Sequence, residues 1–132
     1  DEGEIPGEAV LTGTNAVEVL SAARLSKEQT RARNKETLLE IINSTELSDA
    51  QKQEAVDSMV HMTEIAEKEA AAEVLLQAKG FSEAVVSING DAVDVVVNAA
   101  ELSDVQRAQI EDIVKRKTDI AAENIVISTI TQ

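Results

Sequence analysis

The chain has 132 residues, 43% of them hydrophobic, which fits one domain with a single core. It carries 12 Lys and Arg against 25 Asp and Glu, and the resulting formal net charge of −13 repels nucleic-acid phosphates. Cysteine is absent and Phe81 is the only aromatic residue, which excludes disulfides, thiolate metal sites and sites built on aromatic stacking. We therefore expect an acidic one-domain protein with an aliphatic core.

The first 20 residues predict a lead-in to the folded domain. They hold five acidic residues, three glycines and the only proline, without sustained helical periodicity. We predict an acidic disordered linker over residues 1–20 and a folded domain over residues 21–132. No apolar run approaches the roughly 20 residues that span a bilayer, and the start lacks a signal-peptide pattern. We expect a soluble chain, and since it begins at Asp1 without Met, a fragment whose anchor would lie outside it.

Three matching segments predict helix starts. In each, a Ser hydroxyl can accept from the third following backbone amide while a Gln side chain bonds the Ser amide. The segments are Leu25-Ser26-Lys27-Glu28-Gln29, Leu47-Ser48-Asp49-Ala50-Gln51 and Leu102-Ser103-Asp104-Val105-Gln106. They predict helices over about 26–43, 49–79 and 104–118, and Ala22 and Ala23 would also allow the first to begin slightly earlier.

The first half of the first predicted helix is polar and basic in an otherwise acidic chain. Its apolar residues all lie in the second half, whereas residues 24–35 carry one acid, Glu28, and five cations: Arg24, Lys27, Arg31, Arg33 and Lys35. A polar helical stretch that buries little either faces solvent or docks on something outside the domain. These five cations are therefore candidate partner-binding residues, with a solvated face as the alternative.

The second predicted helix is long for so small a domain. One stripe at three- and four-residue spacing is expected to pack against the rest of the fold: Val56, Met59, Val60, Thr63, Ala66, Ala70 and Val74. Gly80 stands where a left-handed cap is expected, and Phe81 can fold back onto the last helical turn.

Two valine-rich runs flank Asn89-Gly90, which predicts a β-hairpin with a two-residue type I′ turn. That turn would place Val86 opposite Val93 and Ala84 opposite Val95. In the third helix Ile110, Ile113 and Val114 form a short apolar stripe, and residues 124–130 predict a last strand parallel to the second. We expect a two-layer α+β domain of αββαβ order, with a three-stranded sheet packed on helices after an additional N-terminal helix.

The inventory of catalytic groups is poor. His61 is the only histidine, and with Glu64 nearby it makes a weak metal site. The glycines never occur at phosphate-loop or dinucleotide spacing, and the Gly-x-x-Gly loop of KH-type RNA-binding folds of similar order is missing. Lys115-Arg116-Lys117 is best explained as cations at a helix C-terminus. We expect neither an enzyme nor a cofactor.

Several segments together resemble the stage III sporulation protein AH family. They are Arg24-Leu25-Ser26-Lys27-Glu28-Gln29-Thr30-Arg31, Gln53-Glu54-Ala55-Val56, Ala78-Lys79-Gly80-Phe81, residues 109–114 and Asn124-Ile125-Val126-Ile127-Ser128. The resemblance covers about residues 22–130 and rests on the order of the segments. It implies a ring-building domain similar to those of type III secretion basal bodies and the flagellar MS ring.

The same resemblance implies a function and a place. The full protein would be anchored in the mother-cell membrane by an N-terminal helix, with this domain in the space facing the forespore. There it would bind the forespore protein stage II sporulation protein Q and self-associate into a ring as a channel subunit. The alternatives are a ring or adaptor domain of another secretion-type envelope complex, and an enzyme centred on His61.

Overall fold

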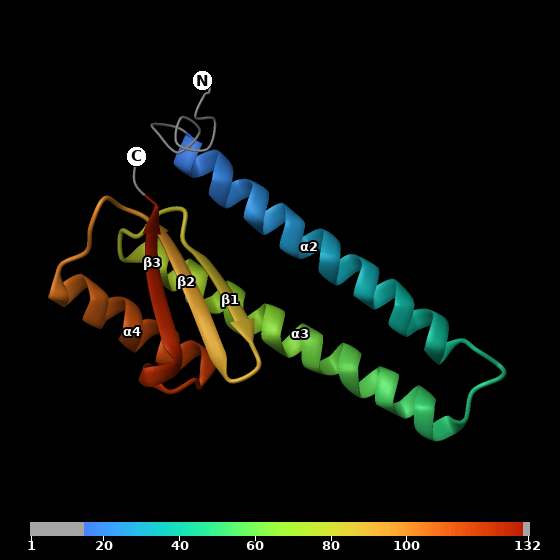
Figure 1. The fold of residues 1–132 in the computed structure, drawn as a ribbon. Helices are drawn as coiled ribbons and strands as arrows, with labels where there is room; N and C mark the ends of the chain where they lie inside the picture. The colour runs from blue at the N-terminus through green and yellow to red at the C-terminus, as the bar shows by residue number, and fades with distance from the viewer. Residues whose placement is uncertain (1–14, 131–132) are drawn as a thin grey trace.

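The computed structural model describes residues 15–130 and shows a two-layer α+β domain, as predicted (Figure 1). Two long helices come first, then a hairpin, a shorter helix and a last strand. Their bounds are α2 Asn15–Ile42, α3 Asp49–Ala78, β1 Val85–Asn89, β2 Ala92–Asn98, α4 Asp104–Thr118, the 3-10 turn η1 Ala122–Asn124, and β3 Ile125–Ile130. Within residues 15–130, no helix combines the length and apolar character needed to cross a membrane.

The sheet has the strand order β1-β2-β3, with β1 and β2 antiparallel and β2 and β3 parallel. The last strand therefore lies beside the second and parallel to it, and the parallel direction is the one that was predicted. The core fills the space between one sheet face and the helices α3 and α4. It is aliphatic apart from one ring and comprises Ala72, Leu76, Phe81, Ala84, Val86, Val93, Val95, Val97, Ile110, Ile113 and Val114.

The two long helices form an antiparallel pair whose far end, with the turn at residues 43–48, projects away from the sheet (Figure 1). Two of the predicted capping boxes are confirmed: Ser48 begins α3 and Ser103 begins α4, each with its reciprocal Gln bond. The basic run at residues 115–117 lies in the last turn of α4, where we placed it.

The predicted cap at Ser26 is wrong, because Ser26 lies inside α2, which already begins at Asn15. Of the linker predicted over residues 1–20, residues 15–20 are therefore helical, while residues 1–14 lie outside the described residues. Ala16 and Leu20, one helical turn apart, are both buried. Packing of these two side chains stabilises the first turns of α2. Residues 15–20 are too few for a helical periodicity to be recognised in the sequence.

The end of α3 follows the prediction. Gly80 has a φ of +98°, its amide donates to Gln77 O, and the Phe81 amide donates to Leu76 O at 2.9 Å. These two bonds form a Schellman motif, and Phe81 and Leu76 join the same core.

The predicted packing stripe of α3 is wrong. Val60 and Val74 are 53% and 66% exposed, and Ala66 and Ala70 are exposed as well. The inward line instead runs through Met62, Ile65, Glu69, Ala72 and Leu76, again at three- and four-residue spacing. The sequence therefore contains a second line of residues at three- and four-residue spacing. It was not recognised as the buried face of the helix because Glu69, a charged residue, lies at its centre.

The predicted hairpin is present, but with a different turn. Asn89 pairs with Ala92 and Val86 with Val95, so the turn residues are Gly90 and Asp91. Among the described turn residues, only Gly90 has positive φ, at +61°. This is the pattern of a type II′ turn, which spares Asn89 the left-handed conformation that a type I′ turn would impose. The shift moves each pairing by two residues, so Val86, Val93 and Val95 still face the core.

Candidate functional site

The outer edge of β1 is covered by charged side chains from α2 and α3. In an antiparallel pair, the backbone N–H and C=O groups of alternate residues point toward the partner strand and away from it. Along β1 the amide and carbonyl of Val86 and the amide of Ile88 are bonded by side chains of α2 and α3. The groups of Ala84, Val86 and Ile88 therefore point away from the sheet.

Four side chains bond these backbone groups. Arg24 Nη2 donates to Ala84 O at 2.6 Å and Lys27 Nζ donates to Val86 O at 2.8 Å. The side chains of two glutamates accept from the amides: Glu73 Oε2 from Val86 N at 2.8 Å and Glu69 Oε2 from Ile88 N at 2.7 Å. We call Arg24, Lys27, Glu69 and Glu73 the edge seal, because together they saturate the outward hydrogen bonds between Ala84 O and Ile88 N.

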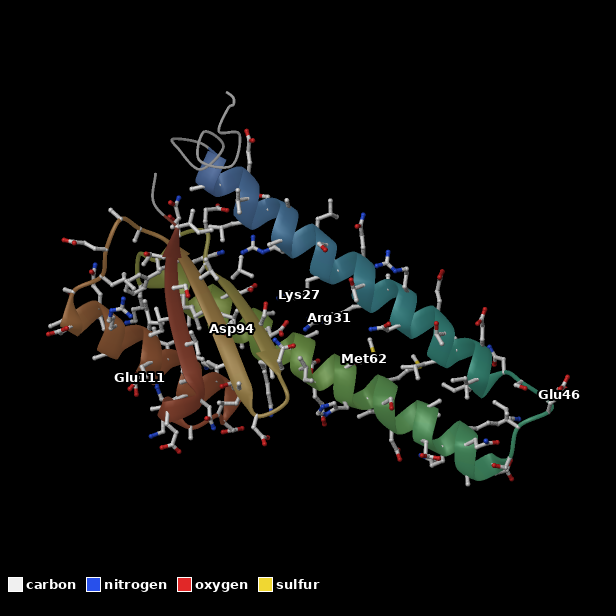
Figure 2. The ribbon with its side chains drawn as sticks, in the orientation of Figure 1. Lys27, Arg31, Glu46, Met62, Asp94 and Glu111 are labelled. Carbon is white, nitrogen blue, oxygen red and sulfur yellow. The ribbon has the colours of Figure 1, made fainter. Side chains whose placement is uncertain are left out.

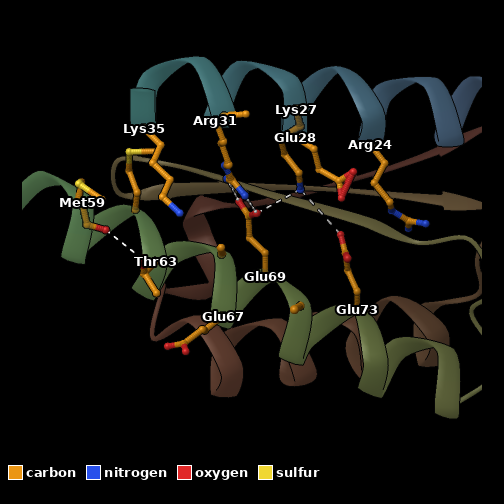
Figure 3. Close-up of a pocket in the computed structure, with 14 residues that line it drawn as sticks. Arg24, Lys27, Glu28, Arg31, Lys35, Met59, Thr63, Glu67, Glu69 and Glu73 are labelled. Atoms are coloured by element: carbon orange, nitrogen blue, oxygen red, sulfur yellow. Dashed lines mark hydrogen bonds and ion pairs between the residues drawn. The ribbon is translucent and has the colours of Figure 1, made fainter. Parts of the chain in front are cut away.

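Glu69 is the centre of this cluster, and its side chain is only 3% exposed. Arg31 holds it in a bidentate contact, with Nη1 to Oε1 at 2.6 Å and Nη2 to Oε2 at 2.8 Å. Lys27 Nζ adds a third cationic donor at 3.1 Å and also lies 3.9 Å from Glu73 (Figure 3). A buried carboxylate with paired, hydrogen-bonded cations is the arrangement in which a charge is tolerated inside a protein.

The protonation of the cluster follows from these contacts. Burial by itself raises the pKa of Glu69, but hydrogen bonds from Arg31 and the Ile88 amide, with the charge and bond of Lys27, outweigh it and hold that pKa below its ordinary value. The hydrogen bond to Glu69 is the main reason that the pKa of Arg31 lies above its ordinary value, against the opposing effect of burial. Glu69 and Arg31 are therefore both charged at neutral pH.

A groove of about 550 Å³ runs between α2 and α3 beside the seal. Its walls combine the seal and Arg31 with small or flexible side chains, among them Ala32, Ala66 and Ala70. The middle of α2 is thus attached to α3 mainly by charges, and the buried apolar side chains of α2 in the described range are Ala16 and Leu20 at its beginning.

The five predicted partner-binding cations fall into two groups. Arg24, Lys27 and Arg31 point from α2 into the molecule, as Figures 2 and 3 show for Lys27 and Arg31. Arg33 and Lys35 are exposed: Arg33 Nη2 lies 3.4 Å from Thr30 Oγ1 on its own helix, and Lys35 lines the groove toward α3 (Figure 3). Partner binding by these five residues stays a prediction, but three of them already have partners inside the domain.

His61, the centre of the alternative metal site, is exposed on α3. In the described part of the chain, His, Asp and Glu side chains do not gather into a group of three that could hold a metal ion. The geometry at His61 supplies neither a second histidine nor a buried acid.

Sequence reasoning missed Glu69 and Glu73, the acidic half of the seal. One signal was available, since Glu69 interrupts the line of Met62, Ile65, Ala72 and Leu76 at the position where an apolar residue is expected. A glutamate in that place predicts a buried carboxylate with a cationic partner. The basic half of α2 is the complementary signal.

Comparisons with known proteins agree on one relationship. The chain is 28% identical over 108 residues to the stage III sporulation protein AH of Bacillus subtilis strain 168, which covers 82% of this chain and 50% of that protein. The chain thus spans about half the length of this curated relative. Its fold matches a chain in the solved structure of the SpoIIQ-SpoIIIAH pore-forming complex, with a TM-score of 0.77 and 24% identity, over 86% of this chain and 98% of that chain. The model of the SpoIIIAH-like protein family matches residues 6–127, and the chain therefore belongs to that family.

Proposed function

We propose that this chain is a non-catalytic structural subunit of the channel between mother cell and forespore during endospore formation. The observation that carries the proposal is the extent of the likeness to the solved complex, which includes 98% of the matched chain. A domain that retains the whole fold of a pore component, and in its described part gathers no metal-binding cluster, is suited to assembly. Its mechanism is protein–protein association and not turnover.

The proposed partner is the forespore protein stage II sporulation protein Q. The solved complex contains a SpoIIQ chain with its SpoIIIAH chain, and the family relationship motivates the same pairing here. The domain would lie in the space between the two membranes, anchored in the mother-cell membrane by another part of the full-length protein, and copies would associate into a ring.

Arg33 and Lys35 are the proposed contact for an acidic surface of that partner. Both are exposed on α2, outside the edge seal, in a chain of net charge −13. In a chain that is otherwise acidic, these two exposed cations, which lie on different faces of α2, would attract an acidic surface of the partner and orient the encounter. Arg24, Lys27 and Arg31 would serve the partner only by leaving their contacts with β1 and Glu69.

The test is a titration of the extracytoplasmic domain of stage II sporulation protein Q with this chain. Arg33→Gln/Lys35→Gln removes the proposed contact, and Lys115→Gln/Arg116→Gln in α4 removes the same charge elsewhere on the surface. We expect the first pair to weaken binding about tenfold more than the second, with the difference shrinking in high salt.

Two results would count against the proposal. Equal effects of the two pairs would reject the basic contact. If the unsubstituted chain does not bind this partner but captures another envelope protein, the proposed channel function would be rejected in favour of an adaptor function.

A further inference from the structure

The two edges of the sheet are in opposite states. At β1, the four side chains of the edge seal bond four outward backbone groups, Ala84 O, Val86 N, Val86 O and Ile88 N, at 2.6–2.8 Å. At β3, which forms the side of the sheet away from α2 in Figure 1, no side chain of the described residues hydrogen-bonds the backbone. An open edge is a template for another strand, whereas a saturated edge covered by a helix is not.

We propose that the edge seal makes strand addition to this sheet one-sided. β3 of one copy could pair with β1 of the next, and the sealed β1 prevents copies of the chain from joining in this way into a continuous sheet. The latent occupant of an unsealed β1 is therefore β3 of a second copy.

The strand directions make that latent contact feasible. β1 is antiparallel to β2, and β2 is parallel to β3, so β1 and β3 run in opposite directions. A second copy placed beside β3 in the same orientation would present its β1 for antiparallel pairing. Such a head-to-tail contact leaves a free β3 at one end and a free β1 at the other, so it repeats and produces open-ended assemblies.

The seal opposes this pairing in two ways. An incoming strand would have to displace hydrogen bonds made by charged groups, which are stronger than those between neutral groups. It would also have to separate Glu69, 3% exposed, from Arg31 and Lys27, leaving a buried carboxylate without its cations.

Side-chain substitution can remove the seal without deleting the core. The seal residues are polar and lie outside the apolar cluster, and a groove of about 550 Å³ already separates α2 from α3 beside them. All four are helical positions, where Ala is the most favourable replacement. The inference goes beyond the proposed function, because it concerns copies of this chain alone and needs no second protein.

The experiment compares two variants of the same composition. The unsealed variant carries Arg24→Ala, Lys27→Ala, Glu69→Ala and Glu73→Ala, and the control carries Arg33→Ala, Lys35→Ala, Glu64→Ala and Glu67→Ala. Each loses one Arg, one Lys and two Glu from α2 and α3, so the net charge stays at −13. Sedimentation velocity over a wide concentration range should show growing, open-ended assemblies for the unsealed variant, while the control sediments like the unsubstituted chain. Circular dichroism verifies that both are folded.

A second arm tests the edge that is used. Val126 and Ser128 are exposed on β3, alternating with Ile125 and Ile127, which pack on the core. Adding Val126→Lys and Ser128→Lys to the unsealed variant should return it to the unsubstituted state, because lysines on an edge strand oppose pairing. Assemblies that persist would overturn the proposal, as would a folded unsealed variant that sediments like the control.

If the fourfold variant does not fold, Arg24→Ala/Lys27→Ala frees Ala84 O and Val86 O while leaving Glu69 with Arg31. Its matched control is Arg33→Ala/Lys35→Ala. We expect the Arg24→Ala/Lys27→Ala variant to assemble at high concentration only. Identical sedimentation of this variant and its control would reject the inference. None of these outcomes depends on binding to stage II sporulation protein Q.

Discussion

Replacing Glu69 with Gln tests whether charge pairing holds α2 against the rest of the domain. The carboxylate receives four hydrogen bonds, two from Arg31 and one each from Lys27 and the Ile88 amide. Gln keeps the shape but has one acceptor oxygen, and its amide N–H groups would face the cationic donors. Glu69→Gln therefore breaks the ion pair with little change in volume.

The size of the effect follows from burial. Removing one member of a buried ion pair costs about 3–5 kcal/mol, because the remaining charge loses its partner. Lys27 and Arg31 are 19% and 28% exposed, so both can regain water once Glu69 is neutral. We therefore expect the lower end, about 3 kcal/mol, which is a large part of the roughly 5–15 kcal/mol that stabilises a typical domain.

Urea unfolding followed by far-ultraviolet circular dichroism is the suitable assay, because the chain has no Trp or Tyr for fluorescence. Glu67→Gln is the matched control, since Glu67 is exposed two residues earlier on α3 and should change stability by less than about 0.5 kcal/mol. Equal midpoints for the two variants would refute the structural role of the ion pair. A double-mutant cycle with Arg31→Gln should give a coupling of about 1–3 kcal/mol.

Three further predictions concern pH and helix ends. Because the pKa of Glu69 is lower in the folded than in the unfolded chain, its stabilisation is present above the ordinary value of 4.5 and is lost as pH falls through the folded pKa. Acid titration of stability should accordingly be steeper for the unsubstituted chain than for Glu69→Gln. Gly80→Ala should lower the melting temperature and cost about 1 kcal/mol or more, because φ is +98° although no atom lies within 4 Å of the added Cβ. Ser48→Ala and Ser103→Ala should each cost about 1 kcal/mol in urea unfolding through the lost cap, whereas Ser26→Ala, inside α2, should be neutral or slightly stabilising. A loss at Ser26 as large as at Ser48 would contradict the position of Ser26 inside the helix.

Local signals in the sequence were sufficient where the chemistry was local. The boxes at Ser48 and Ser103 and the Gly80-Phe81 ending each involve residues within one or two helical turns, so neighbouring residues decide them. The order of elements and the α+β class follow from the same kind of signal, together with the connection rule for parallel strands.

The turn at Gly90 shows where local information stops. Asn89-Gly90 and Gly90-Asp91 both suit a two-residue turn, and both keep the same valines on the core face. Sequence pattern cannot separate two registers that differ by two residues, since the side-chain period is also two.

The acidic, aliphatic and almost non-aromatic character of the chain is evident from its residues alone, and the helix starts at Ser48 and Ser103 and the hairpin could be predicted from them. In contrast, the start of α2 at Asn15 and the inward direction of Arg24, Lys27 and Arg31 depend on packing against the rest of the fold. The physical reason is distance along the chain, because these cations meet groups 38 to 60 residues away. A charged side chain has the same sequence pattern whether it faces water or a buried carboxylate, and folding alone brings Glu69 and the edge of β1 within its reach.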